Sequence, residues 1–213
     1  KRLEIINSVR LQDEYLWGIS EVPSLWPTAA LQAQAIASRT YALAKSTKVR
    51  SACDCHLYGS ISDQSFAGWA KEGEPKYGQL WKSAVDSTQG QIISYQGLPI
   101  TAYFTSSTGG ATETSEHAWG TATSYTQSVP DTASADIKLN PKFATWSRQV
   151  PQSVIAAAFL LPDVLSLQVL SVNPAGTVDQ IQATSSSGAT ATLTGETFRS
   201  RSKLPSAWFA ITG

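Results

Sequence analysis

A long stretch of small apolar and uncharged polar residues follows Pro27, and this pattern predicts a helix from Pro27 to about Lys48. Proline suits the first turn of a helix, where its missing N–H group costs no hydrogen bond. The rest of the stretch contains neither glycine nor proline, and Arg39 is the only ionised side chain before Lys45. No acid stands three or four positions from Arg39, so its partner is expected to come from another segment.

Alternating apolar and polar residues in the last third of the chain predict a small antiparallel sheet. The expected strands cover residues 167–172, 178–184 and 189–193, and a helix near residues 151–161 precedes them. A second helix is expected over residues 80–88, and residues 91–95 and 100–104 form a hairpin pattern around Gln96-Gly97-Leu98-Pro99. The chain is therefore expected to contain both helices and antiparallel strands.

These elements predict an α+β fold, in which one long alanine-rich helix packs on an antiparallel sheet and the carboxy-terminal part is rich in β-structure. A chain of 213 residues is long enough to bury a sizeable core. We expect a single domain over residues 1–213, with a β-rich subdomain over residues 146–213. The chain begins at Lys1-Arg2-Leu3 without a secretory signal, as expected for a mature or amino-terminally trimmed fragment.

The charges of the chain are balanced, with 16 basic and 16 acidic residues and a formal net charge of zero. No overall field would draw such a protein toward nucleic acid or an anionic membrane. The longest apolar run, from Val154 to Leu161, is too short to cross a bilayer. We therefore expect neither a nucleic-acid partner nor a membrane span.

Glu21 is the strongest candidate for chemistry. It lies just ahead of the long helix, among the apolar residues Trp17, Ile19, Val22 and Trp26. Apolar surroundings raise the pKa of a carboxyl group, so that it can hold a proton near neutral pH as a general acid. The residues alone leave a second role open, in which Glu21 caps the helix and complements its dipole. Arg39 is expected either to tie its helix to a distant acceptor, or to orient Glu21 or bind a sugar oxygen.

The two cysteines stand close together in Cys53-Asp54-Cys55-His56. A structural zinc site needs four ligands, and two cysteines and two histidines are too few in this arrangement for us to expect a metal. A local disulfide, which an extracellular setting favours, and two free thiols both remain open. The common serine-hydrolase, phosphate-loop and zinc-protease motifs are missing, and no pattern supports a triad of His117 with Ser106 or Ser107.

Several ordered motifs resemble the SpoIID/LytB family of stage II sporulation protein D and amidase-enhancer domains. Ser20-Glu21-Val22-Pro23, Trp26-Pro27 and the run from Ala30 to Ala42 match the family signature, S-E-M-P followed by W-P-x-E-A-L-K-A-Q-A-V-A-A-R-T-Y-A. Asp63-Gln64, residues 84–91, residues 102–110 and Ser128-Val129-Pro130-Asp131 agree with later family motifs in the right order. Arg199-Ser200 and residues 204–209 resemble the closing motif. The similarity spans nearly the whole chain.

The resemblance implies a lytic transglycosylase that cleaves peptidoglycan glycan strands between N-acetylmuramic acid and N-acetylglucosamine, with Glu21 as acid and base and without a cofactor. Ala30 and Gln32 replace a glutamate and a lysine of the family pattern, so Glu21 must carry the chemistry. Supporting or substrate-binding roles are implied for Arg39, Gln64, Tyr103, Ser106, Ser107, Thr108, Gly109, Gly110 and Trp119. We expect Glu21 and Arg39 to line one cleft that the Ser106–Gly110 loop faces.

Two other functions are compatible with the same resemblance. The chain would serve as a non-catalytic cell-wall binding module that stimulates an N-acetylmuramoyl-L-alanine amidase, or as a structural envelope domain in which Glu21 is a helix cap. The transglycosylase and the amidase enhancer would both bind peptidoglycan glycan strands, and we expect the protein outside the cytoplasm, in the bacterial cell wall or secreted.

Overall fold

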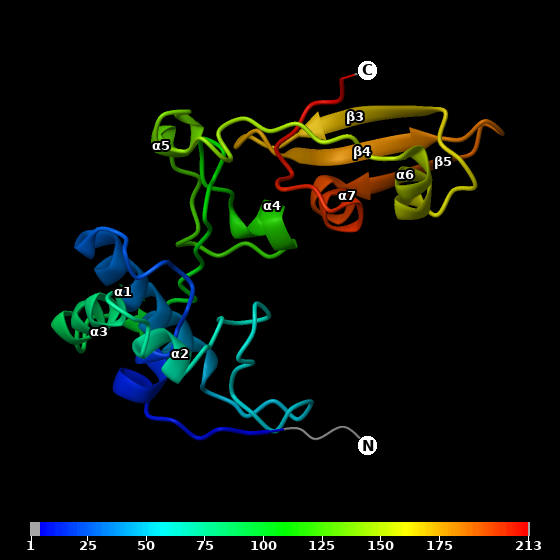
Figure 1. The fold of residues 1–213 in the computed structure, drawn as a ribbon. Coiled ribbons are helices and arrows are strands. Elements are labelled where there is room, and N and C mark those ends of the chain that lie inside the picture. Colours follow the sequence, from blue (N-terminus) through cyan, green and yellow to red (C-terminus); the bar gives the residue numbers. More distant parts are fainter. Residues whose placement is uncertain (1–4, 213) are drawn as a thin grey trace. The chain divides into compact units, whose positions relative to one another are not determined.

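A computed structural model describes residues 5–212 and divides the chain into two compact units, one ending at Phe104 and the other beginning at Thr105. Each unit combines helices with an antiparallel sheet, which confirms the α+β class. In Figure 1 the amino-terminal unit runs from blue to green and the carboxy-terminal unit from green to red. The β-rich segment expected at residues 146–213 lies within the carboxy-terminal unit.

The amino-terminal unit is built around the long helix α1 (Thr28–Lys45), which begins directly after Pro27 and ends three residues before the expected end. The helix α3 (Gly78–Ser87) and the π-helical turn η1 (Leu11–Tyr15) pack on α1, and the short α2 (Trp69–Glu72) packs on α3. Their shared core holds the fully buried side chains of Leu16, Ile19, Leu31, Trp81 and Val85. This core fixes the segment between η1 and α1, on which Glu21 lies.

The long helix packs chiefly on another helix rather than on a sheet. The apolar side of α3, with Trp81, Ala84 and Val85, covers the face of α1 that contains Leu31 and Ala35. α1 also contacts β2 (Leu98–Pro99), which pairs with β1 (Ser94–Tyr95) in a two-stranded hairpin. The expected hairpin is therefore present but short, and the Ile100 N–H donates to the Ile93 carbonyl at 3.2 Å just beyond the paired residues.

The carboxy-terminal unit contains a three-stranded antiparallel sheet in the order β3–β4–β5, formed by β3 (Ser166–Val172), β4 (Val178–Thr184) and β5 (Thr190–Thr194). Each strand lies within one residue of its expected bounds, because the alternation that predicts it is also the alternation of buried and exposed faces. Val169, Ile181 and Leu193 pair across the three strands and form the centre of the buried face.

Helices cover the buried face of this sheet. The helix α6 (Gln152–Phe159) and the helix α7 (Gly195–Ser202) pack on each other and on the sheet (Figure 1). Phe159 and Phe198 meet at their contact, with ring centroids 5.5 Å apart. The short helices α4 (Ser115–Trp119) and α5 (Thr132–Ala135) precede this layer in the chain.

The tail after α7 closes the carboxy-terminal unit. The Val178 N–H donates to the Ala207 carbonyl at 2.9 Å, and Phe209 lies 5.6 Å from Phe198 between ring centroids. The Trp208 indole lies against Gly109, Gly110 and Gly176, where a Cβ atom would approach it to 3.0 Å or less. Gly109 and Gly110 of the Ser106–Gly110 loop therefore leave space for the Trp208 ring of the same unit.

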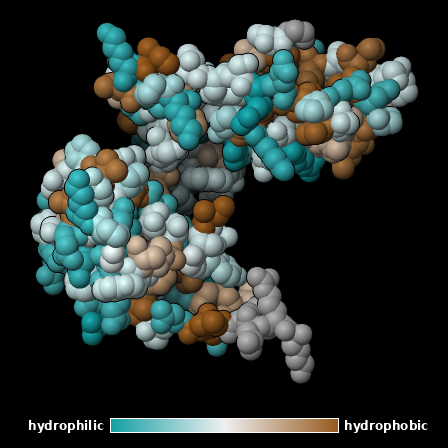
Figure 2. Space-filling model, viewed as in Figure 1, coloured by the Kyte–Doolittle hydropathy of each residue, from teal (hydrophilic) through white to brown (hydrophobic). Residues whose placement is uncertain are grey.

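Apolar side chains on the face shown in Figure 2 are interspersed with hydrophilic ones on both units. Among residues 5–212, none of the helices combines the length and the apolar character that crossing a lipid bilayer demands.

Candidate active site around Glu21

Glu21 is fixed by the segment that runs beside it. Ile19 pairs with Phe66 in an antiparallel bridge, and the Ser20 N–H donates to the Ser65 carbonyl at 2.8 Å. The Ser65 N–H in turn donates to Glu21 Oε1 at 2.6 Å. The cap of α1 is Pro27, which makes no side-chain capping bond, so Glu21 serves the neighbouring segment and not the helix end.

Glu21 lines an open pocket of about 430 Å³, which lies within the size range of small-molecule sites. Its walls are formed by Ser20–Pro23 on one side and by Ala67, Ala70, Lys71 and Glu74 on the other. Glu21 is half-buried as a residue, and its carboxyl group is anchored by the bond from the Ser65 N–H. A carboxyl group held in this way can exchange a proton with a bound molecule.

Lys71 and Glu74 are pocket residues that sequence reasoning missed, because the run Lys71-Glu72-Gly73-Glu74 has the appearance of a solvated surface. Lys71 is only 5% exposed; its Nζ donates to the Val22 carbonyl at 2.6 Å and lies 3.9 Å from Glu74 Oε2. Burial lowers the pKa of Lys71, and Glu74 acts in the opposite direction. Glu74 also accepts a bond from the Ser24 hydroxyl at 2.7 Å. These contacts tie α2 and its following turn to the Glu21 segment.

Asp63 anchors the start of the Asp63–Ser65 segment, whose last residue donates its N–H to Glu21. Its carboxylate accepts from both terminal nitrogens of Arg50 at 2.7 Å, from the Tyr41 hydroxyl at 3.0 Å and from the Tyr58 N–H at 2.8 Å. Burial by itself would raise the pKa of Asp63, but these hydrogen bonds outweigh burial and hold the pKa below its ordinary value. Burial, together with the bond to Asp63, raises the pKa of Tyr41 to about 12.

Gln64 lies in the interior and not on the pocket wall. Its side chain is fully buried, and its Oε1 accepts from the Tyr15 hydroxyl at 2.9 Å. The amide nitrogen, Nε2, is buried without a hydrogen-bond partner among the described residues. Gln64 is therefore a core residue beside the site. It has no exposed surface for a substrate to contact, so the structure does not support the substrate-binding role that the resemblance implies.

Arg39 is held by uncharged acceptors and does not pair with Glu21 within the described part of the chain. The guanidinium donates to Gln12 Oε1 at 3.0 Å, to the carbonyls of Val85 and Gln91 at 3.1 Å, and to the Thr88 hydroxyl. Burial lowers the pKa of Arg39. The expectation of an external partner is correct, but the expected Glu21 pair is wrong, because backbone carbonyls of α3 and the following turn satisfy the guanidinium.

The other residues implied by the resemblance divide between the two units. Tyr103 belongs to the amino-terminal unit, is exposed, and contributes to the raised pKa of Tyr41. Trp119, at the end of α4 in the carboxy-terminal unit, is 60% exposed. Tyr103 and Trp119 are therefore exposed aromatic residues, one in each unit.

The Ser106–Gly110 loop belongs to the carboxy-terminal unit, where Ser106 is exposed. The Thr108 hydroxyl donates to Asp131 Oδ2 at 2.9 Å, and Asn140 Nδ2 donates to the Ser107 hydroxyl at 3.0 Å. Gly109 and Gly110, for which the resemblance implies a supporting or substrate-binding role, lie against the Trp208 ring. His117, whose ring lies 3.1 Å from Glu113 Oε1, pairs with an acid on its own segment.

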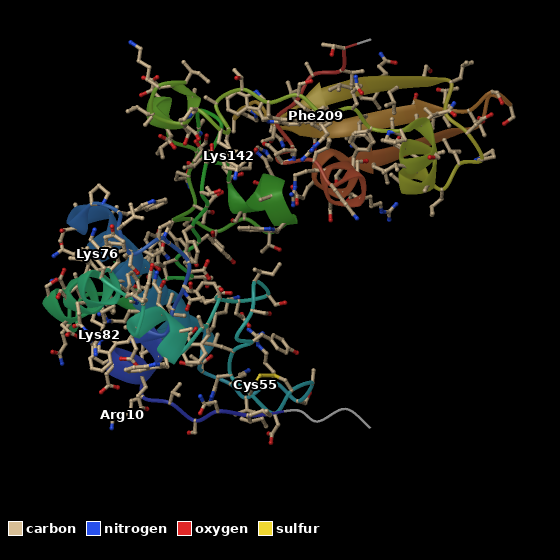
Figure 3. The ribbon with its side chains drawn as sticks, in the orientation of Figure 1. Arg10, Cys55, Lys76, Lys82, Lys142 and Phe209 are labelled. Atoms are coloured by element: carbon tan, nitrogen blue, oxygen red, sulfur yellow. A yellow bond between two sulfur atoms is a disulfide. The ribbon has the colours of Figure 1, made fainter. Side chains whose placement is uncertain are left out.

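Cys53 and Cys55 are joined by a disulfide, which decides between the two alternatives that the sequence leaves open (Figure 3). The bridge lies in a tight turn that the Arg50 N–H closes by donating to the Cys55 carbonyl at 2.8 Å. Within residues 5–212, the histidines, cysteines and acids do not gather in groups of three or more that could hold a metal.

Comparisons with known proteins agree with the sequence motifs. Residues 1–95 match the family model of the stage II sporulation protein, SpoIID. Stage II sporulation protein D of Bacillus amyloliquefaciens is 31% identical over 206 residues, which cover 89% of this chain and 55% of that protein. The amidase enhancer of Bacillus subtilis (strain 168) is 33% identical over 119 residues, which cover 55% of this chain and 15% of that protein.

Stage II sporulation protein D of Bacillus subtilis (strain 168) is 34% identical over 129 residues, or 55% of this chain and 37% of that protein. The chain thus spans about half the length, or less, of these relatives. The chain is therefore similar to the SpoIID/LytB family, through the family model over residues 1–95 and through a relative aligned over 89% of this chain. The segment that matches the family model contains Glu21, Arg39 and Gln64.

Proposed function

We propose that the protein is a peptidoglycan lytic transglycosylase that cleaves glycan strands between N-acetylmuramic acid and N-acetylglucosamine. The observation that carries the proposal is the carboxyl group of the half-buried Glu21, anchored by one N–H group in an open pocket. Glu21 also stands at the acid position of the family signature. Relatives named for sporulation and for amidase enhancement support a role at the cell wall.

One carboxyl group suffices for the reaction. Protonated Glu21 donates its proton to the glycosidic oxygen while the bond from C1 of N-acetylmuramic acid to that oxygen breaks, and positive charge develops at C1 and the ring oxygen. The Glu21 carboxylate then takes the proton of the C6 hydroxyl as the C6 oxygen bonds to C1. The products are a 1,6-anhydro-muramoyl end and a free 4-hydroxyl on N-acetylglucosamine, and no water is consumed.

The pocket supplies the polar groups that such a step requires. Ser65 holds one oxygen of Glu21, which keeps the carboxyl group in one orientation as its proton leaves and returns. Lys71 is committed to the Val22 carbonyl and to Glu74, so its positive charge is partly neutralised by Glu74. Glu74 accepts a bond from the Ser24 hydroxyl and lies 3.9 Å from Lys71 Nζ. Glu74 thus has two side-chain partners in the pocket wall, whereas the Glu21 carboxyl group is bonded to a single N–H group, and we assign the role of acid to Glu21.

A second candidate function is non-catalytic enhancement of a cell-wall amidase. The relative named amidase enhancer favours it, since 33% identity extends over 119 residues. In that case the pocket binds a glycan strand without cleaving it, and an N-acetylmuramoyl-L-alanine amidase is the partner. We place the protein outside the cytoplasm under both functions, and the Cys53–Cys55 disulfide suits such a compartment.

Product chemistry separates the two functions. The purified protein is incubated with intact peptidoglycan and with glycan strands stripped of stem peptides, and the products are analysed by mass spectrometry. Anhydro-muramoyl ends that disappear in Glu21→Gln support the transglycosylase. Strand binding without new ends, combined with faster release of stem peptides by an added amidase, would instead support the enhancer.

A further inference from the structure

We infer that Asp63 is a positioning residue for Glu21, acting through the backbone of the Asp63–Ser65 segment. The inference deepens the proposed function and rests on it. Asp63 and Ser65 are two positions apart in the chain, and each is bound to a different part of the amino-terminal unit. Asp63 fixes one end of the segment to α1 and to the disulfide turn, and Ser65 presents its N–H to Glu21.

The carboxylate of Asp63 is the most heavily bonded acid beside the site. Two nitrogens of Arg50, the Tyr41 hydroxyl and the Tyr58 N–H all donate to it, and its side chain is 2% exposed. Bidentate bonds to a guanidinium fix both distance and orientation. Such bonding leaves Asp63 with a single position relative to Tyr41 on α1.

Bonds on the other residues of the segment carry this position to Glu21. Gln64 accepts the Tyr15 hydroxyl bond in the core, so the middle of the segment is also held. Ser65 then makes two bonds with the Glu21 segment, because its carbonyl accepts from Ser20 and its N–H donates to Glu21. A shift at Asp63 would move the N–H group on which the Glu21 carboxylate depends.

The Arg50 side of the anchor is itself fixed. Arg50 N–H bonds to the Cys55 carbonyl, and the Cys53–Cys55 bridge lies within the same turn. The Arg50 guanidinium also lies over the Tyr58 ring, 5.3 Å from its centroid. The disulfide turn therefore presents a pre-oriented guanidinium to Asp63, at low cost in side-chain freedom.

Two variants test the inference, since they weaken the anchor to different degrees. Asp63→Asn removes the charge in nearly the same volume, and Tyr41→Phe removes one hydroxyl donor. The control is Asp163→Asn, whose carboxylate bonds to Ser186 in the carboxy-terminal unit. All are assayed on peptide-stripped glycan strands, at a temperature where circular dichroism shows each variant folded, and the Ser65 amide is followed by NMR.

We expect Asp63→Asn to lower kcat by about ten- to a hundredfold, because a shift of about 1 Å in a catalytic group has effects of this size. Tyr41→Phe should lower kcat less, and KM should change by less than about threefold in both. The Ser65 amide resonance should move in both variants but not in Asp163→Asn. If Asp63→Asn does not fold, Tyr41→Phe carries the test.

A wild-type kcat together with an unmoved Ser65 amide, in a folded Asp63→Asn or Tyr41→Phe protein, overturns the inference. Failure of the proposed function has a different signature, in which the wild-type protein forms no anhydro ends or Glu21→Gln cleaves normally. The Ser65 amide still decides in that case whether Asp63 positions the segment.

Discussion

Glu21 and Glu74 are two carboxyl groups in one pocket with different bonding, and they provide a matched pair of substitutions. Glu21→Gln is nearly isosteric but has no acidic proton, so we expect cleavage to fall by about 10²–10⁴-fold with the fold retained. Glu74→Gln should still yield anhydro-muramoyl ends. Measuring anhydro products per unit time for both variants checks this, and equal losses would point to a two-carboxylate mechanism.

Trp69 is an exposed aromatic residue on α2, the helix that supplies two residues of the pocket wall. It precedes the pocket residues Ala70 and Lys71, its side chain is 76% exposed, and its indole lies against Gly73. A pyranose ring offers an apolar face that can stack there. We expect Trp69→Ala to raise KM for glycan strands about fivefold, equivalent to about 1 kcal/mol, while Trp69→Phe raises it less. An unchanged KM in a folded Trp69→Ala protein would contradict this.

The depressed pKa of Asp63 links its ion pair to acid stability. The unfolded chain binds a proton at Asp63 near the ordinary pKa of 3.8, whereas the folded protein binds it only at lower pH. The contribution is thus present above about pH 4 and is lost as pH falls through the folded pKa. Urea titrations at pH 6 and pH 3 should show a smaller loss of stability in Asp63→Asn than in the wild type.

For single residues, the sequence indicates which side chains are candidates for chemistry better than it indicates their hydrogen-bond partners. Glu21 is recognisable from its apolar neighbours and its family motif. The acceptors around Arg39 are largely backbone carbonyls, which leave no mark on the sequence. Lys71 reaches the pocket only because its short helix packs on α3, and a mixed-charge run gives no sign of that burial.

At the scale of elements, the packing of the Ser106–Gly110 loop on Trp208 can be tested by substitution. Gly109 and Gly120 both have φ of +79°, but a Cβ on Gly109 would lie 2.5 Å from the Trp208 ring, whereas one on Gly120 meets nothing within 4 Å. Both alanine variants bear the strain of positive φ, about 1 kcal/mol. Gly109→Ala should lose a further 1–3 kcal/mol, roughly, through overpacking. Chemical denaturation of both variants measures the difference, and equal losses would argue against it.

The strands and long helices were predictable because their signals are local. In β4, buried and exposed residues largely alternate along the strand, and Pro27 marks the start of α1. The packing of α1 on α3 was not predictable, since alanine-rich surfaces suit a helix and a sheet equally well. The role of the loop glycines also depends on Trp208, almost a hundred positions away, and composition alone cannot reveal such a contact.

At the scale of the whole molecule, the α+β class follows from the order of the elements, but the boundary between the units does not. It falls after Phe104, inside a continuous family motif that runs from Ala102 to Gly110. No linker composition marks it, because the residues on both sides have structural roles in their own units. The sequence therefore indicates the family resemblance and the candidate acid, whereas the division of the candidate site residues between the two units depends on contacts that have no sequence signal.

The hydrogen bonds of Arg39 determine which segments of the amino-terminal unit should unfold together. Its guanidinium joins α1 to η1 through Gln12, to α3 through Val85 and Thr88, and to the following turn through Gln91. Segments linked through one buried group should exchange their amide hydrogens in a common opening event. The carboxy-terminal unit has its own core and should open with a different free energy. Hydrogen exchange should resolve these two events, and Arg39→Ala should divide the first into separate openings of α1 and α3.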